Sequence, residues 1–86
     1  MKYIFVDESW EDYLYWQKND KKILFKINDL LKDIAINPCS GIGKPEPLKY
    51  KYKGYWSRRI DNEHRLIYRC KGDEIHIAKC RFHYDD

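Results

Sequence analysis

The sequence predicts an α+β fold in which two N-terminal helices pack on one face of a twisted, mainly antiparallel sheet. Apolar residues recur at helical spacing between residues 9 and 34, whereas β-rich segments separated by turn residues follow residue 47. A chain of 86 residues can build one core but not two. We therefore expect a single domain spanning residues 1–86, with the element order β-α-α-β-β-β-β.

The first elements are indicated by local signals. Residues 3–6 are β-branched and aromatic, which predicts a short strand. Ser9, with Asp12 three residues later, resembles a capping box and predicts the start of a helix that ends near Asn19.

Asp20 can cap a second helix, and Asn37-Pro38 should stop it. Five apolar residues of this segment share one helical face: Ile23, Ile27, Leu30, Leu31 and Ile34. That face should pack against the sheet.

The second half of the chain predicts a loop followed by consecutive antiparallel strands. Residues 39–47 contain two Gly and two Pro and form the loop. The strands are expected at residues 48–53, 55–60, 64–70 and 74–83. Two helices can cover only one face of such a sheet, so the other face should be open.

Charge is distributed unevenly along the chain. Residues 1–42 carry a net charge of −1 and residues 43–86 a net charge of +4, and all five arginines follow residue 57. Basic surface mixed with aromatic rings suits a nucleic acid, although a solvated sheet face would have the same composition.

Several classes of protein are excluded by composition. No apolar run is long enough to span a membrane, so we expect a cytoplasmic protein with no membrane partner. The three cysteines lack CxxC spacing and are expected to be reduced thiols. Neither a metal site nor a cofactor is expected.

The basic half contains the side chains that metal-free RNA cleavage requires. A base must take the proton of the 2′-hydroxyl, an acid must protonate the leaving 5′-oxygen, and cations must stabilise the phosphate. Glu46 is the candidate base because Pro45 and Pro47 restrict its backbone. The alternative is that Pro-Glu-Pro only stiffens a surface connection.

Arginine suits the phosphate because its planar fork can donate two parallel hydrogen bonds. Arg65 should project opposite to Leu66, although an ion pair with Glu63 or Glu74 is the alternative. Arg58 and Arg59 point to opposite faces, and we assign Arg59 to the site. Lys49 would add a point charge.

The candidate acid is His83, because histidine changes charge near neutral pH. Its position after a strongly β-patterned segment predicts that it stays on the sheet. Tyr84 could stack on a base or contact phosphate. His64 is an alternative acid, but a structural role beside a turn fits it better.

Five ordered blocks of the sequence resemble one known family. They are residues 8–17, Gly43-Lys44-Pro45-Glu46-Pro47-Leu48-Lys49, Trp56-Ser57-Arg58-Arg59-Ile60, Glu63-His64-Arg65-Leu66 and Cys80-Arg81-Phe82-His83-Tyr84. Together they resemble the YoeB/Txe toxins of the RelE-like group, over essentially the whole chain. The resemblance implies a RelE-like fold of the microbial-ribonuclease type.

The resemblance also implies a toxin of a type II toxin–antitoxin system that cuts mRNA in the A site of the 70S ribosome. The family's base, phosphate-stabilising arginine and acid match Glu46, Arg65 and His83. Its supporting RNA-contact positions match Lys49, Arg59 and Tyr84. The implied partners are a Phd/YefM-type antitoxin and a second toxin copy, with operator DNA bound only through the antitoxin complex.

Two other functions fit the same residues. A non-catalytic protein could block translation by occupying the ribosome, and a free-standing ribonuclease could cut naked RNA.

The chain departs from the family at its C-terminal end. Family members typically end at or beside the His-Tyr pair, whereas this chain continues with Asp85-Asp86. We expect these two acids to have only a modest effect on cleavage.

Overall fold

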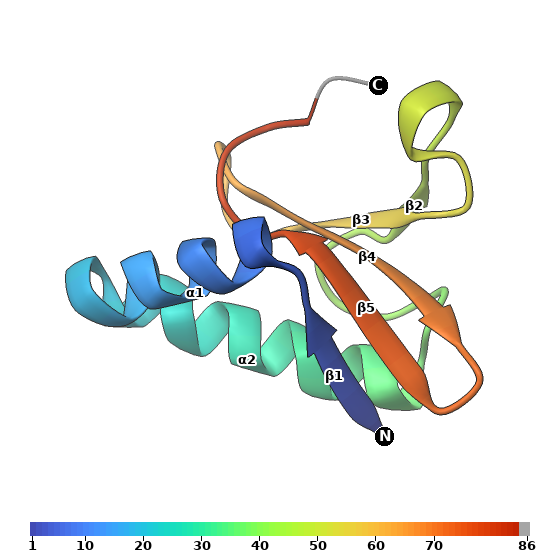
Figure 1. Cartoon of the computed structure of the whole chain (residues 1–86), viewed down its shortest axis with the longest axis horizontal. Coiled ribbons are helices and arrows are strands. Elements are labelled where there is room, and N and C mark those ends of the chain that lie inside the picture. Colours follow the sequence, from blue (N-terminus) through green and yellow to red (C-terminus); the bar gives the residue numbers. More distant parts are fainter. Residues whose placement is uncertain (85–86) are drawn as a thin grey trace.

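The computed structural model describes residues 1–84 and shows two helices on one face of a five-stranded mixed sheet (Figure 1). The strand order is β1-β5-β4-β3-β2. β1 (Lys2–Phe5) runs parallel to β5 (Glu74–Lys79), and all other neighbours are antiparallel. The predicted fold class and element order are confirmed, while Asp85 and Asp86 lie outside the described residues.

The remaining strands form the edge of the sheet that carries the candidate site. They are β2 (Glu46–Pro47), β3 (Trp56–Arg59) and β4 (Arg65–Lys71). In their register Glu46 pairs with Ser57, and Arg59 pairs with Arg65.

The two helices are α1 (Asp7–Asn19) and α2 (Lys21–Ile36). Asp20 separates them, and its Oδ1 accepts hydrogen bonds from the first-turn N–H groups of Lys22 (3.1 Å) and Ile23 (3.3 Å). This is the predicted cap, which satisfies two donors that the helix leaves unpaired. No helix of the described part is long and apolar enough to cross a membrane.

Ser9 does not begin α1, so that prediction was wrong. The helix starts at Asp7, and Ser9 lies fully buried in its first turn. Its hydroxyl accepts a hydrogen bond from the Val6 N–H (3.0 Å) and donates to the Ile77 carbonyl of β5 (2.6 Å). Ser9 therefore connects α1 to β5, through a contact between residues that are distant in the sequence.

The core lies between the helices and the sheet. Four of the five predicted stripe residues of α2 are buried, and Ile23 is half-buried. The buried residues of this cluster are Trp16, Leu24, Ile27, Leu30, Leu31, Ile34, Ile60, Leu66, Tyr68, Ile75, Ile77 and Cys80.

The opposite face of the sheet is only partly open, which corrects the expectation. Ile67 alternates with the core residues Leu66 and Tyr68 and stands outside the helix-facing cluster, yet it is 1% exposed. Leu48 is likewise buried outside that cluster. The open surface of this face is therefore limited to its remaining parts.

Two predicted strands differ from the observed structure. Residues 48–53 contain the 3₁₀ helix η1 (Tyr50–Tyr52) instead of a strand, because Tyr50 adopts a positive φ of 54° and turns the chain. β5 ends at Lys79 and not at residue 83. Beyond it Phe82 has a positive φ of 67°, which turns the chain again after the strand has ended.

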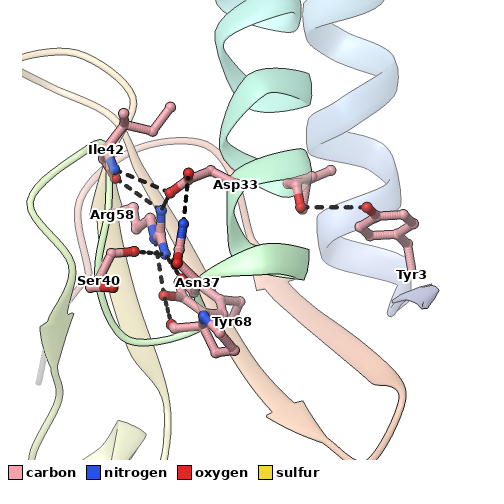
Figure 2. A network of polar contacts seen from close by, with 9 residues as sticks. Tyr3, Asp33, Asn37, Ser40, Ile42, Arg58 and Tyr68 are labelled. Carbon is pink, nitrogen blue, oxygen red and sulfur yellow. Dashed lines mark hydrogen bonds and ion pairs between the residues drawn. The ribbon is translucent and has the colours of Figure 1, made fainter.

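A buried arginine connects α2, β3 and the loop between them (Figure 2). Arg58 is fully buried. Its five N–H groups have five acceptors: Asp33 Oδ2 at 2.5 Å, the carbonyls of Asn37 (2.5 Å), Ser40 (2.6 Å) and Ile42 (3.0 Å), and the Tyr68 hydroxyl at 3.1 Å. The guanidinium therefore has no unsatisfied donor.

Gly43 continues this loop toward the site. Its φ of +80° favours glycine, and a Cβ there would lie 2.8 Å from Leu30 Cδ2. Its carbonyl accepts a hydrogen bond from the Arg59 N–H at 2.7 Å. The loop thus meets β3 beside the residues that lead to Glu46.

We expect Arg58→Met to lower the free energy of unfolding by about 3–5 kcal/mol, because the Asp33 carboxylate and several carbonyls would lose their shared donor. Urea unfolding measures this change. Lys71→Met removes an exposed cation and serves as the control. An Arg58→Met protein as stable as the control would contradict the structural role of the network.

Asp33→Asn should lower stability in a pH-dependent way. Hydrogen bonding to Arg58 holds the pKa of Asp33 below its usual value. Such a carboxylate stabilises the fold above its unfolded-state pKa, and the contribution is lost as the pH falls. The stability difference between wild type and Asp33→Asn should therefore be largest at neutral pH and shrink below about pH 4.

Urea unfolding at neutral and acidic pH measures this difference. Asp29→Asn changes an exposed carboxylate of the same helix and is the control. A difference for Asp33→Asn that stays constant with pH would show that the charge of Asp33 is not what matters.

Candidate active site

A cavity of about 440 Å³ lies over the edge formed by β2, β3 and the start of β4. It is lined by Lys44, Pro45, Glu46, Ser57, Arg59, Arg65 and Tyr84. Four of the six residues predicted from the sequence are thus brought together, although they are up to 38 positions apart in the chain.

Glu46 is one of only two residues in β2 and is exposed. Pro45 restricts the backbone before it, and Pro47 disfavours a helical conformation at Glu46 itself. Pairing with Ser57 then fixes the strand against β3. The carboxylate therefore reaches solvent from a well-determined backbone.

Arg59 and Arg65 face each other across β3 and β4. The Nη1 atom of Arg65 donates to the carbonyls of Asp61 (2.7 Å) and His64 (3.0 Å), which orients the guanidinium. Within residues 1–84 its Nη2 has no such bond, so one side of the fork can bind an anion. Arg59 is exposed.

The alternative ion pairs of Arg65 are not found within the described part of the chain. The carboxylate of Glu74 lies 3.0 Å from His76 Nε2, and that of Glu63 lies 3.6 Å from His64 Nε2. Backbone carbonyls hold Arg65 instead. Its charge is therefore not neutralised by a neighbouring carboxylate of either glutamate.

Asp61 forms the turn that carries Arg65. Its Oδ1 accepts hydrogen bonds from the N–H groups of Glu63 (2.9 Å) and His64 (2.6 Å). Partial burial raises the pKa of Asp61, but these backbone bonds, together with the nearby positive charge of Arg65, outweigh it and the net pKa is lowered. The charged carboxylate thus stabilises the turn.

His64 is a structural residue and not a free acid. It is 7% exposed, and its ring meets Trp16 edge-on at 4.7 Å between centroids. Its Nδ1 accepts the Phe82 N–H at 2.7 Å, while the Phe82 carbonyl accepts the Arg65 N–H at 3.1 Å. These bonds hold the C-terminal segment beside β4.

Tyr84 reaches the cavity from this segment, but His83 does not line it. His83 is exposed, and its carbonyl accepts a hydrogen bond from Lys79 Nζ at 3.2 Å. The prediction that His83 stays on the sheet was wrong, because the Trp16 indole and the Asp12 carboxylate bind the backbone of Cys80 and end β5.

Lys49 also lies outside this cavity. It precedes η1 and borders a separate cavity that Leu48, Tyr50 and Lys53 share with it. Of the predicted site residues, Lys49 and His83 are therefore the two that the structure does not bring to the cavity.

Sequence reasoning missed Lys44 and Ser57. Ser57 lies two positions before Arg59, and strand alternation places both on one face, so that spacing could have identified it. Among residues 1–84, three cations line the cavity, Lys44, Arg59 and Arg65, against one carboxylate, that of Glu46. The cations of this lining suit an anion, and the Glu46 carboxylate can act as a base.

Comparison with known proteins identifies the family. The family model described as YoeB-like toxin of bacterial type II toxin–antitoxin system matches residues 5–84. Toxin YoeB of Escherichia coli (strain K12) is 57% identical over 84 residues, which cover 98% of this chain and 100% of that protein.

Solved structures agree with this match over the same length. A YoeB/ParE toxin from Agrobacterium tumefaciens superposes with a TM-score of 0.95 at 48% identity, covering 98% of this chain and 100% of that one. A heterotetrameric YoeB–YefM complex and a YoeB dimer, both from Staphylococcus aureus, each give a TM-score of 0.92 at 50% identity, with 98% of both chains covered. The chain therefore belongs to the YoeB-like toxins of bacterial type II toxin–antitoxin systems.

Proposed function

We propose that this toxin is a ribosome-dependent endoribonuclease that cuts mRNA in the A site and thereby stops translation. The observation that supports this proposal is that Glu46, Arg59 and Arg65 line the same cavity. One carboxylate beside two guanidinium groups suits a reaction that needs a base and gathers negative charge on a phosphate.

In this proposal Glu46 takes the proton of the ribose 2′-hydroxyl. The 2′-oxygen then attacks phosphorus, the bond from phosphorus to the 5′-oxygen breaks, and a cyclic phosphate and a 5′-hydroxyl end remain. Arg65 donates its unused N–H groups to the phosphate, and Arg59 adds a second cation opposite it. Lys49 contacts RNA farther from the reacting atoms.

His83 supplies the proton that the leaving 5′-oxygen takes. It directly precedes Tyr84, whose side chain lines the cavity, so rotation of the backbone beyond Phe82 can carry the imidazole inward. Tyr84 then contacts the phosphate or stacks on a base. In this reaction the protein's own side chains perform the acid and base steps.

The same family membership supports the proposed partners. A YefM-type antitoxin would neutralise this toxin, since the Staphylococcus aureus relative forms a YoeB–YefM heterotetramer. A second copy of this chain would form a homodimer, as a relative does. Operator DNA would be bound only through the antitoxin complex, and the protein would act in the cytoplasm.

Glu46→Gln, Arg65→Ala and His83→Gln should each slow cleavage of ribosome-bound mRNA by roughly 10²–10⁴-fold, because each removes a group used in the transition state. Single-turnover cleavage on purified ribosomes measures the rate, and co-sedimentation measures ribosome binding. Glu11→Gln removes an exposed carboxylate of α1 and is the control. Variants that inhibit translation like wild type without cutting would indicate a non-catalytic inhibitor.

Toeprinting on programmed ribosomes and on naked mRNA tests ribosome dependence. We expect cuts within the A-site codon on ribosomes and little cutting of naked mRNA. Similar rates on both substrates would instead identify a free-standing ribonuclease. Absence of any cut while translation stops would overturn the enzymatic proposal.

A further inference from the structure

A second cavity, of about 300 Å³, lies on the face of the sheet that turns away from the helices. Its lining includes Tyr52, Tyr55, Arg69, His76 and Lys79. The residues that alternate with Arg69 and His76 along β4 and β5, such as Tyr68 and Ile77, belong to the helix-facing core. The proposed mechanism uses none of the five lining residues named here.

A row of aromatic rings joins this cavity to the candidate active site. Tyr84 lines the first cavity and meets Tyr52 edge-on at 6.5 Å between centroids. Tyr52 in turn meets Tyr55 edge-on at 6.1 Å, and both of these line the second cavity. All three tyrosines are half-buried, so the row is continuous and part of each ring stays accessible.

Cations accompany the row. The exposed Arg69 guanidinium lies 5.3 Å from the centroid of the Tyr55 ring. Lys79 Nζ lies 3.8 Å from a carboxylate oxygen of Glu8, which also lines this cavity. The nearby Glu74 carboxylate is engaged by His76 at 3.0 Å. Arg69 therefore presents a positive charge beside an aromatic face.

We propose that Tyr52, Tyr55 and Arg69 form a second RNA subsite, which holds a nucleotide beyond the two that flank the scissile linkage of the same single strand. A base stacks on Tyr55, and the adjoining phosphate binds Arg69. This inference rests on the proposed function and extends it. Because every base has a flat face and a phosphate, the subsite adds affinity without reading the sequence.

Single-stranded RNA fits this surface better than an acidic peptide does. A peptide carboxylate would be recognised by the cation alone and would leave the ring faces unused. RNA carries flat bases and phosphates along one strand, and the path from Tyr84 through Tyr52 and Tyr55 ends at the Arg69 guanidinium, so it offers both ring faces and a cation. The continuity with the first cavity favours the strand that is being cut.

Fluorescence anisotropy with labelled 2′-O-methyl RNA tests the subsite, because the methyl group blocks cleavage but leaves bases and phosphates in place. The probes are a dinucleotide, which supplies the scissile linkage and its two flanking nucleotides, and a hexanucleotide, which also extends over the subsite. Wild type should bind the hexanucleotide about 10-fold more tightly. Tyr55→Leu and Arg69→Gln should lose this gain in affinity and bind the dinucleotide like wild type.

Two control variants should still bind the longer RNA more tightly than the shorter one. They are Phe25→Leu, which changes an exposed ring of α2, and Lys21→Gln, which changes an exposed cation of α2. Thermal unfolding checks that each variant is folded, and the exposed position of Arg69 makes its variant usable even where Tyr55→Leu is unstable. Equal affinity of wild type for the two probes, or an undiminished gain in the folded Arg69→Gln protein, would overturn the subsite.

Two further measurements distinguish an RNA subsite from a surface that binds a protein partner, and distinguish failure of the subsite from failure of the proposed function. If Arg69→Gln weakens binding of a YefM-type antitoxin and leaves RNA binding unchanged, the surface belongs to a protein partner and the proposal fails. Cleavage of ribosome-bound mRNA by wild type is measured separately. Failure there would overturn the proposed function alone, because binding of the blocked RNA does not depend on cutting.

Discussion

The buried guanidinium of Arg58 is the interaction on which the geometry of the site depends. A charge removed from water is tolerated only where every donor is matched, and here five acceptors match five donors. Four of the acceptors come from α2 and the segment that follows it. Any movement of that segment away from β3 would leave buried polar groups unpaired, so the chain that leads to Glu46 is held in place.

Neighbouring arginines on β3 have opposite roles for the same geometric reason. Side chains alternate along a strand, so Arg58 enters the interior while Arg59 lines the cavity beside Arg65. The interior arginine fixes the strand against the loop, and the exterior one lines the cavity. A shift of one residue in the register would exchange these environments and destroy both arrangements.

The sequence allowed the fold to be predicted wherever a repeating pattern was long enough. The stripe of α2 and its Asp20 cap are local signals, and both are present. The start of α1 and the end of β5 depend on contacts between distant segments, which no local pattern contains. Ser9 illustrates this, since its hydroxyl is bound by β5, 68 residues away. The turn at Tyr50 depends on a positive φ that residues other than glycine rarely adopt.

For the site, the motifs and strand alternation placed Glu46, Arg59, Arg65 and Tyr84 correctly at one cavity. Their chemical roles remain predictions. The anchoring of the C-terminal segment by His64 could not be foreseen, because it depends on a backbone N–H 18 positions away. For the same reason the sequence did not indicate where His83 lies.

Within residues 1–84, a hydrogen bond to its carbonyl is the contact that holds His83, so its position is compatible with catalysis. Phe82 is fixed by bonds to His64 and Arg65, so movement can begin only beyond it. The hydrogen bond from Lys79 to the His83 carbonyl is exposed to water. Its loss costs about 0.5–1.5 kcal/mol, which two or three charge-assisted bonds to a bound phosphate would outweigh. In the proposed reaction the fixed arginines and the short terminal segment would therefore divide the work. The arginines would bind the phosphate in a preformed cavity, and the terminal segment would complete the site once RNA has entered.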